Sequence, residues 1–430
     1  MSDAPDLLIL GAKQLLTCAS SAEHARSRRG EPGGVTPARG AAQRDLGILE
    51  GVGLGVKDGL IHEIAGNAEL AARHPAARIV DASDSLILPG FVDCHTHLLF
   101  AGDRAAEWEQ RMAGASYLEI LKAGGGIRST MKHTRAATSD ALKSHARLWL
   151  RRMLQQGTVH VEAKTGYRLD SDGELEMLRI HRELDAEGPQ GITSTYLGAH
   201  VVPPEHRENR QAYLSLVDET LKRAAAERLC DFVDVFCEDE AFSLAETRDI
   251  LELGRSLGLG LKLHTEQFTS SGGARLGAEL GAASVDHLEV ATPDDIAALA
   301  AHPSPPVCVL LPGVAFHLRL ETQAPGRALI DAGVPVALAT DFNPGSSPTP
   351  SMPLMIALAT RTQGLSVAEA IVAATRNAAC AVDRGERLGT LEVGKRCDVQ
   401  LLDVPDYRYL GYGFGYNPVR QVLIGGEPQL

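Results

Sequence analysis

The chain has 430 residues, of which 44% are hydrophobic and 23% charged, and its formal net charge is −13. This length predicts one large domain with a smaller companion, and the composition is that of a globular protein. The acidic balance argues against a nucleic-acid partner, which needs a basic surface, and no segment approaches the ~20 apolar residues that span a membrane.

The cysteines and the N-terminus indicate the compartment. Seven cysteines are scattered along the chain without a C-x-x-C pair, so neither a disulfide framework nor a thiolate zinc site is expected. The first residues, MSDAPDLLILGAK, are acidic and carry a shorter apolar run than a secretory signal. We expect a cytoplasmic protein.

The first part of the chain carries short apolar runs separated by turn residues. We expect strands at 7–10 and within 53–66, and Asp58-Gly59 in the second stretch predicts a hairpin turn. Residues 19–47 are rich in Gly, Ala, Arg, Pro and Ser and show no apolar periodicity. That stretch predicts a surface loop.

Eight apolar runs then alternate with longer amphipathic stretches such as 139–156 and 242–258. Buried parallel strands are near-continuous apolar runs, and their alternation with helices gives βα units. Eight units predict an α/β protein with a closed TIM (β/α)8 barrel over residues 89–380. The runs are LILPGFVDCHTH, TVHVEAKTGY, ITSTYLGAH, FVDVFCE, LGLKLHTEQ, AASVDHLE, PVCVLLPG and VPVALATDFNPG.

The last fifty residues return to short strands and turns, in the same style as the N-terminal part. We therefore expect residues 1–88 and 381–430 to pair into one small β-sandwich domain beside the barrel.

Polar residues gather at the predicted carboxyl ends of the barrel strands, which is where TIM barrels carry their active sites. A random scatter of 15 histidines would not place five of them there. In chain order the strand ends carry His95, His97, Lys164, Tyr167, His200, Glu238, His264, Gln267, His287, Asp341 and Asn343.

The pair His95 and His97 points to a metal site. Two residues apart on a strand, both imidazoles face the same side. His264 and Asp341 would complete three nitrogens and one oxygen, which is the style of a catalytic zinc site. Zinc lowers the pKa of its water to about 7 and polarises a carbonyl, which suits hydrolysis.

Each histidine also has an ordinary structural interpretation. H-x-H alone often occurs by chance, and the metal interpretation rests on its place at a strand end together with the later strand ends. His160, inside a strand, is expected to be a core histidine. We expect the helix and loop histidines to lie at the surface, namely His133, His145, His181 and His302.

With GFVDCHTHLLFAGDR the chain resembles the amidohydrolase superfamily, whose first barrel strand ends in H-x-H. Further stretches narrow the resemblance to the imidazolonepropionase family, and it covers essentially the whole chain after about residue 48. They are RMAGASYLEILKAGGGIRST, KTGYRLDSDGELEML, TYLGAHVVPPEHRENR, DFVDVFCED, KLHTEQF, LLPGVAFHL, ALATDFNPGSSPTPSMPLM and YRYLGYGFGYNPVRQV.

The resemblance implies hydrolysis of the cyclic amide of 4-imidazolone-5-propanoate to N-formimidoyl-L-glutamate, in histidine degradation, by a homodimer. It implies one metal ion per chain, because the fourth strand lacks the lysine that bridges two metals in relatives. Zinc is the favoured metal and iron is the alternative. The implied metal ligands are His95, His97, His264 and Asp341, and the implied substrate contacts are Arg104, Tyr167, His200, Gln267, Asn343, Gly345 and Ser346.

The implied catalytic roles follow from side-chain chemistry. Arg104 would hold the propionate with a bidentate fork. Asp341 is the first candidate for the general base, with His287 as its partner or alternative. His200 would polarise the ring carbonyl.

The chain departs from the family pattern at Gln267, where some members carry glutamate, and at Arg168, where glycine is expected. Glutamine cannot act as a base, although it can hydrogen-bond the ring. The adjacent Glu266 should face another direction. The segment 19–47 is also longer than usual, but no metal ligand is affected.

Two alternatives stay open. A deaminase or another cyclic-amide hydrolase of the superfamily would share the ligand set, and only the longer family blocks discriminate against it. A non-catalytic scaffold would have lost a metal ligand, whereas all four positions are filled here.

Overall fold

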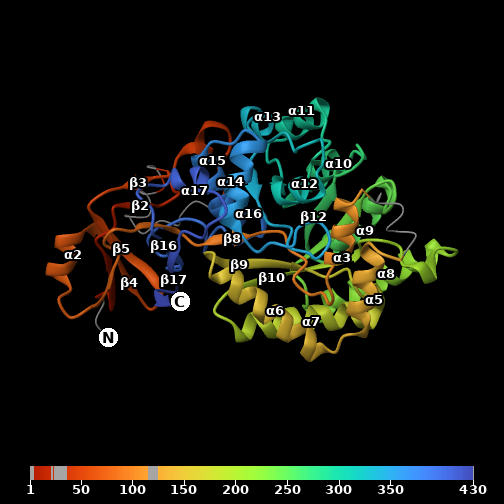
Figure 1. The fold of residues 1–430 in the computed structure, drawn as a ribbon, viewed down its shortest axis with the longest axis horizontal. Coiled ribbons are helices and arrows are strands. Elements are labelled where there is room, and N and C mark those ends of the chain that lie inside the picture. Colours follow the sequence, from red (N-terminus) through yellow and green to blue (C-terminus); the bar gives the residue numbers. More distant parts are fainter. Residues whose placement is uncertain (1–3, 21–22, 24–35, 115–123, 430) are drawn as a thin grey trace.

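A computed structural model describes residues 4–20, 23, 36–114 and 124–429. Eight parallel strands follow one another in a single sheet that curls into a barrel, as the sequence predicts (Figure 1). The strands are β8 (Phe91–Asp93), β9 (Thr158–Lys164), β10 (Gly191–Ala199), β11 (Phe232–Cys237), β12 (Gly260–Thr265), β13 (Ser284–His287), β14 (Val307–Leu310) and β15 (Val336–Leu338).

The barrel closes between its first and last strands at the end that carries the histidines. The hydroxyl and N–H of Thr340 donate to Asp93 over 2.6 and 3.0 Å. Beyond the strands, the N–H of Asp341 donates to the carbonyl of His95 at 3.0 Å. The first and last βα units are thereby joined where we expect the metal ligands.

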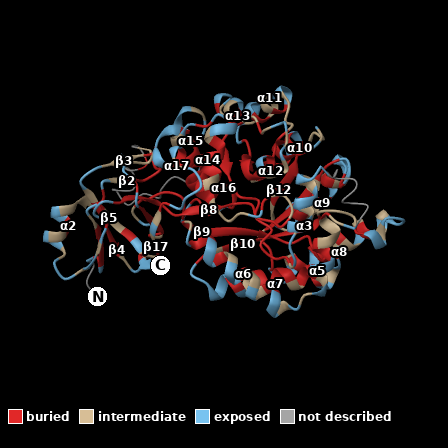
Figure 2. Cartoon of the chain, in the orientation of Figure 1, coloured by how far each residue is buried: buried red, intermediate tan, exposed pale blue. Residues whose placement is uncertain are grey.

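Helices cover the outside of the barrel, and Figure 2 shows them buried on the side that faces the strands. Ser243, Thr292 and Ser366 begin three of them with reciprocal capping boxes, which satisfy N–H groups that a helix leaves free. The larger helices are α5 (Ile127–Ala136), α6 (Ser139–Leu154), α7 (Ser171–Glu187), α8 (Arg210–Ala226), α9 (Leu244–Ser256), α10 (Gly273–Leu280), α11 (Pro293–Ala301) and α14 (Met352–Thr362).

Shorter helices fill the connections between these elements. They are α3 (Ala105–Met112), α12 (Pro312–Leu318), α13 (Gly326–Asp331), α15 (Val367–Val372), the π-helical turn η3 (Ala373–Asn377) and α16 (Ala378–Ala381).

The two ends of the chain form two further sheets beside the barrel, in the order β5-β4-β1-β6 and β18-β17-β16-β7-β2-β3. Leu7 and Leu54 of the first sheet pack with Ile87 and Val399 of the second, so the sheets share one core. The strands are β1 (Leu7–Leu10), β2 (Gln14–Leu16), β3 (Ile48–Leu49), β4 (Val52–Lys57), β5 (Leu60–Gly66), β6 (Arg78–Asp81), β7 (Leu86–Pro89), β16 (Val399–Leu402), β17 (Val419–Ile424) and β18 (Glu427–Pro428).

Two details differ from the sequence analysis. The run LILPGFV, expected as part of one barrel strand, is divided at Gly90 between β7 of the small domain and β8 of the barrel. Residues 21–22 and 24–35 of the expected loop lie outside the described residues. Its end forms the short helix η1 (Gly40–Arg44), and the buried Gln43 exchanges two hydrogen bonds with Val336 of the barrel.

The expected hairpin is present. Asp58 and Gly59 join β4 to β5 with φ values of 50° and 78°, as a turn that matches the strand twist requires.

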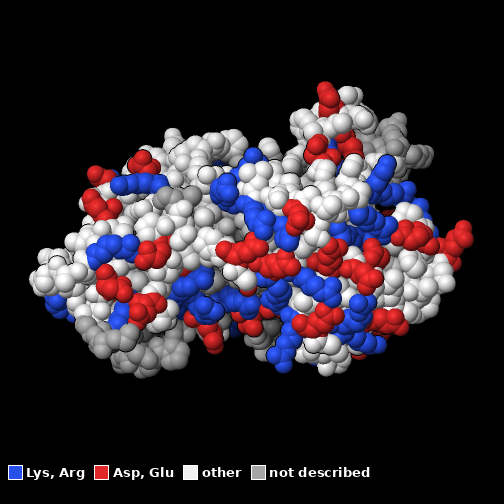
Figure 3. Space-filling view, turned by 90° about the horizontal axis from the view of Figure 1, so that it is seen from below, with Lys and Arg blue, Asp and Glu red and all other residues white. Residues whose placement is uncertain are grey.

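Acidic and basic side chains are interspersed over the face seen in Figure 3. Exposed ion pairs such as Arg147–Glu187, at 2.7 Å, and Lys143–Glu183, at 3.0 Å, join α6 to α7. Pairs of this kind contribute about 0–1 kcal/mol, so the buried core carries the stability. Among the described residues, we find no helix with the length and apolarity needed to cross a bilayer.

Candidate metal centre and substrate pocket

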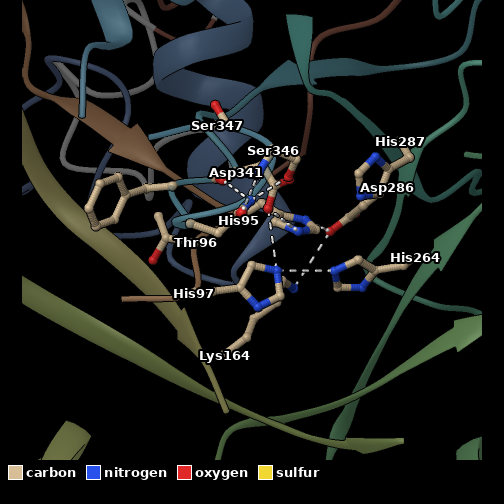
Figure 4. A network of polar contacts seen from close by, with 12 residues as sticks. His95, Thr96, His97, Lys164, His264, Asp286, His287, Asp341, Ser346 and Ser347 are labelled. Atoms are coloured by element: carbon tan, nitrogen blue, oxygen red, sulfur yellow. Dashed lines mark hydrogen bonds and ion pairs between the residues drawn. The ribbon is translucent and has the colours of Figure 1, made fainter. Parts of the chain in front are cut away.

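Three imidazoles and one carboxylate converge at the carboxyl end of the barrel (Figure 4). His95 and His97 follow β8, His264 lies on β12, and Asp341 follows β15. Oδ1 of Asp341 lies 3.5 Å from Nε2 of His95 and 3.3 Å from Nε2 of His97. Nε2 of His264 lies 3.4 Å from Nε2 of His97. Ligand atoms of His95, His97 and Asp341 thus lie within 4.8 Å of one another, and His264 adjoins this group through Nε2 of His97.

Buried carboxylates fix the orientation of two of these imidazoles. Nδ1 of His95 donates to Oδ2 of Asp286 at 2.6 Å, and Nδ1 of His264 lies 3.0 Å from Oδ2 of Asp234. Burial holds the pKa of His95 well below its ordinary value and lowers that of His264 to about 4. Both rings are therefore neutral, with the proton on Nδ1 and a lone pair on Nε2.

The cluster fits a metal ion. Nε2 of His95 and Oδ1 of Asp341 are buried and have no hydrogen-bond partner in the described part of the chain. Nε2 of His264 and Nε2 of His97 lie 3.4 Å apart beside them. Ligands ~2.0–2.1 Å from a tetrahedral zinc ion lie ~3.3–3.4 Å apart, close to the observed 3.3–3.5 Å spacings.

Asp341 sits on a constrained backbone. Its φ is 49°, in the left-handed region that aspartate tolerates better than most residues. Burial raises its pKa, but neighbouring imidazoles, His97 first, lower it, and the net pKa is below the ordinary value. The hydroxyl of Ser346 donates to Oδ2 at 3.2 Å, which leaves Oδ1 directed at the histidines.

His287 ends β13 next to the cluster. A ring nitrogen lies within 4.8 Å of ligand nitrogens of His95 and His264. Nδ1 lies 3.4 Å from the buried carboxylate of Glu289. Burial lowers and Glu289 raises the pKa of His287, and the net value lies above the ordinary one. The ring is therefore placed to exchange a proton beside the metal cluster.

A cavity of about 1060 Å³ opens over this cluster. Except for the fully buried His95, every metal-ligating, catalytic and substrate-contacting residue expected from the sequence lines it. They are His97, Arg104, Tyr167, His200, His264, Gln267, His287, Asp341, Asn343, Gly345 and Ser346.

His200 and Tyr167 form one wall of the cavity. Nδ1 of His200 donates to the carbonyl of Gly166 at 3.0 Å, and burial holds the pKa of His200 well below its ordinary value. Its Nε2 is therefore an acceptor. Gly166 permits this contact, because a Cβ there would lie 2.9 Å from Nδ1 of His200. Burial raises the pKa of Tyr167, which keeps its hydroxyl protonated.

Asn343 shapes the turn after β15. Its side-chain oxygen accepts from the N–H groups of Gly345 and Ser346, at 2.7 and 2.8 Å. Its amide donates to the carbonyl of Asp341 and to the hydroxyl of Ser346, both at 2.7 Å. Because an amide has two donors and two acceptor sites, Asn343 is saturated within the turn. The backbone N–H groups of Gly345 and Ser346 are accordingly engaged by Asn343.

Arg104 brings positive charge into the cavity. Its Nε donates to Glu107 at 2.6 Å, which leaves the two terminal nitrogens for another partner. A Cβ at Gly345 would lie 2.7 Å from Nη1 of Arg104, so the guanidinium packs against the glycine.

The two glutamates near Gln267 are already engaged. Glu238 accepts from the backbone N–H groups of Gln267, Phe268 and Thr269 over 2.9–3.1 Å. Glu266 accepts from Gly272 and Ala274 at the start of α10, so it faces away from the cavity as expected. The anchoring role of Glu238 was not predicted, although its place at a strand end is the signal that marks it.

Three residues outside the cavity were also singled out by the sequence analysis, and one of them differs from expectation. His181, expected at the surface, is fully buried on α7, where its Nδ1 lies 2.9 Å from the hydroxyl of Ser194. His160 is a core histidine as expected, with a hydrogen bond to Thr193. Arg168 is buried away from the cavity and donates to the carbonyl of Ala137.

Sequence reasoning missed the carboxylates that orient the metal ligands. The signal was available, because charged residues inside apolar strand runs are rarely buried without a partner. They are Asp234 and Asp286, with Glu162 and Lys262 near them; Lys164, which the sequence analysis placed at a strand end, lies between the two aspartates and does not line the cavity.

The chain has close counterparts among known proteins. The amidohydrolase family model matches residues 86–428. The imidazolonepropionase of Chloroflexus aggregans is 44% identical over 432 residues, with 98% of each chain covered. That of Geobacillus kaustophilus is 41% identical over 426 residues, covering 98% of this chain and 97% of the relative. The chain belongs to the imidazolonepropionase family of amidohydrolases.

Solved structures of more distant amidohydrolases share the fold. A zinc-bound adenosine deaminase from Xanthomonas campestris superposes with a TM-score of 0.68 at 20% identity, covering 99% of this chain and 93% of the other. Guanine deaminase of E. coli gives 0.69 at 14% identity, with 98% and 99% covered. At these identities the likeness concerns the barrel and its companion domain alone.

Proposed function

We propose that this member of the imidazolonepropionase family hydrolyses the ring amide of 4-imidazolone-5-propanoate to N-formimidoyl-L-glutamate, a step of histidine degradation. The observation that carries the proposal is a cluster of three imidazole nitrogens and one carboxylate oxygen at the base of a cavity that also holds Arg104. A hydrolytic centre and an anion-binding group thus share one cavity.

Arg104 binds the propionate. Its two free guanidinium nitrogens match the two oxygens of a carboxylate, and a charge-assisted pair of this kind fixes both position and direction. Tyr167 keeps its proton and donates from the neighbouring wall. His200, with Nε2 as an acceptor, receives a ring N–H, a role that its hydrogen bond to Gly166 favours over polarising the carbonyl.

His95, His97, His264 and Asp341 hold one metal ion, for which we propose zinc, with iron the alternative because His/carboxylate sites suit both. When bound, such an ion supplies Lewis acidity, which polarises a carbonyl and makes a water molecule acidic.

Asp341 and His287 move the protons. As a water molecule adds to the ring carbonyl, a proton passes to Asp341 or to His287, and the same group returns it to the nitrogen that leaves. Gln267 takes no part in this transfer because an amide is not a base. Glu238 and Glu266 accept hydrogen bonds from backbone N–H groups, so neither acts as a general base in place of Gln267.

The rival proposal is deamination of an amino-heterocycle by the same ligands. The metal-loaded protein should be given freshly generated imidazolone propionate, followed by its ultraviolet absorbance, and separately adenosine and guanine, followed by ammonia release. We expect rapid ring opening and no ammonia. Ammonia release without ring opening would overturn the substrate assignment while leaving the hydrolase chemistry in place. The homodimer and the cytoplasmic location stay predictions from the sequence.

A further inference from the structure

A cluster of five charged side chains lies inside the barrel behind the metal ligands. The side chains are fully buried and come from strands β9, β11, β12 and β13. They are Glu162, Lys164, Asp234, Lys262 and Asp286. Burying three carboxylates and two ammonium groups costs desolvation free energy, so the contacts between them must compensate for that cost.

Lys164 occupies the centre of this cluster. Its Nζ lies 2.9 Å from Glu162 Oε1, 2.7 Å from Asp234 Oδ2 and 3.7 Å from Asp286 Oδ2. The two aspartate oxygens are the same ones that approach the imidazoles: Asp286 Oδ2 faces His95, and Asp234 Oδ2 faces His264. One ammonium group therefore contacts both carboxylates that orient metal ligands.

We propose that Lys164 is a positioning residue for the metal centre, which clamps Asp234 and Asp286 so that His264 and His95 present Nε2 to one point. The inference rests on the proposed function of the site. It concerns a residue that touches neither the substrate cavity nor the ligand atoms that converge there.

Electrostatics explains why a clamp is needed. Asp234 and Asp286 carry like charges in a medium of low dielectric, where their repulsion is far stronger than in water. Lys164 draws both toward itself and holds the acceptors at the distances that the Nδ1–H groups require. Carboxylates that hydrogen-bond metal-ligating histidines typically contribute 10–100-fold to metal affinity, and Lys164 holds two such carboxylates in place. Removing either lysine makes the buried cluster one charge more negative, so the general attraction of the cluster for a cation changes alike in Lys164→Met and Lys262→Met.

Lys262 is a matched control. It is equally buried in the same cluster, and its Nζ lies 3.2 Å from Glu162 Oε2. Its other contacts are the carbonyls of Cys94 and Ala381, at 3.1 and 3.4 Å. Among the described residues it makes no ion pair with either aspartate that orients a histidine, although burial raises the pKa of Asp286 and the charge of Lys262, like that of Lys164, lowers it. A role that consists only of neutralising buried charge would be shared by both lysines.

The test measures the affinity for zinc ion alone, by competition with a chromogenic chelator, in the wild type and in Lys164→Met, Lys164→Gln and Lys262→Met. We expect both Lys164 variants to bind zinc about 10–100-fold more weakly, and Lys262→Met to lose clearly less affinity than either of them. Lys164→Gln is shorter than lysine but keeps a hydrogen-bond donor in the cluster, so it carries the test if Lys164→Met fails to fold.

The visible spectrum of the cobalt-substituted protein gives a second readout, because it reports ligand geometry and not stability. We expect altered bands in the Lys164 variants and unchanged bands in Lys262→Met. Equal zinc affinity in all variants, or equal losses for both lysines, would overturn the inference and leave the proposed function standing. Failure of the wild type to bind either zinc or iron would instead overturn the proposed function itself.

Discussion

Gly345 and Arg104 meet in the substrate cavity, and their contact allows a sharp test of anion binding. A Cβ at Gly345 would lie 2.7 Å from Nη1 and 3.1 Å from Cζ of Arg104, so Gly345→Ala must displace the guanidinium. A hydrogen bond to a charged group contributes about 1.5–3 kcal/mol. We expect KM for imidazolone propionate to rise about tenfold or more, with kcat little changed, because the carboxylate is held alike throughout the reaction.

Arg104→Met provides the control for this prediction. It should raise KM at least as far, and adding Gly345→Ala to it should raise KM no further, since the group to be displaced is gone. Independent effects of the two substitutions on KM would contradict the assignment of Arg104 as the propionate ligand.

At the level of single residues, the sequence predicted that the candidate metal ligands would lie together, but it did not predict the carboxylates that contact them. His95, His97, His264 and Asp341 stand at strand ends, and strand ends of a TIM barrel share one face. Asp234 and Asp286 lie within strands, and their partners depend on which strands pair and in what register. Strand pairing and register are set by tertiary packing and cannot be predicted from any one segment.

Glu238 anchors the loop that follows β12. Its carboxylate accepts from three successive N–H groups, of Gln267, Phe268 and Thr269, and so holds Gln267 against the cavity. Glu238→Gln replaces an acceptor by a mixed donor and loosens the loop. We expect kcat/KM to fall by up to about 10²-fold, as a misplacement of ~1 Å can cause, with zinc affinity unchanged.

The matched control is Glu240→Gln, an exposed position on the same loop after β11 that also borders the cavity. It should leave kcat/KM at the wild-type value. If both substitutions had the same effect, the loss would reflect the overall charge of the cavity and not the anchoring of the loop.

Glu369 lies in the first turn of α15 and joins this helix to α13 and η1. It accepts from the Ser366 N–H, from Arg327 and from Arg44 of η1, over 2.7–2.9 Å. Burial raises its pKa, but these hydrogen bonds outweigh burial and lower it to about 2. A carboxyl with a depressed pKa stabilises the fold above its unfolded pKa near 4.5, and this stabilisation is lost as the pH falls toward 2.

We therefore expect Glu369→Gln to reduce the free energy of unfolding by about 2–3 kcal/mol near neutral pH. The difference from the wild type should shrink as the pH is lowered from about 4.5, as measured by urea unfolding. A difference that stays constant over this range would show that the charge of Glu369 contributes nothing.

At the level of elements, helices were easier to predict than strand membership. The stretches 139–156 and 242–258 became α6 and α9, because capping residues and apolar periodicity act within one helix. The run LILPGFV was predicted as one strand, yet it is shared by two sheets that meet at Gly90. Gln43 likewise packs on Val336, a contact nearly 300 residues away in sequence that composition does not indicate.

For the whole molecule, the metal should contribute to stability. A ligand that binds only the folded state stabilises it by about 2.7 kcal/mol at 100 times its Kd. We expect Tm of the wild type to fall on chelation and to recover with added zinc. His264→Ala, which lacks one ligand, should show a Tm that responds far less to either treatment; an equal response would place the stabilising ion elsewhere.

The architecture of the whole molecule was the most predictable feature. Alternating βα units predicted the barrel, and the similar β-like ends predicted the companion domain, since both patterns repeat over long stretches.

The most direct test of the account is reconstitution of the metal-free protein with zinc, with turnover of imidazolone propionate measured after each addition. Four candidate ligands at one end of the barrel, with both nearby glutamates engaged by backbone N–H groups, predict a single ion. We expect turnover to rise linearly from near zero and to level off at one zinc per chain. A break at two, or full turnover in the metal-free protein, would contradict the mononuclear centre on which the proposed function depends.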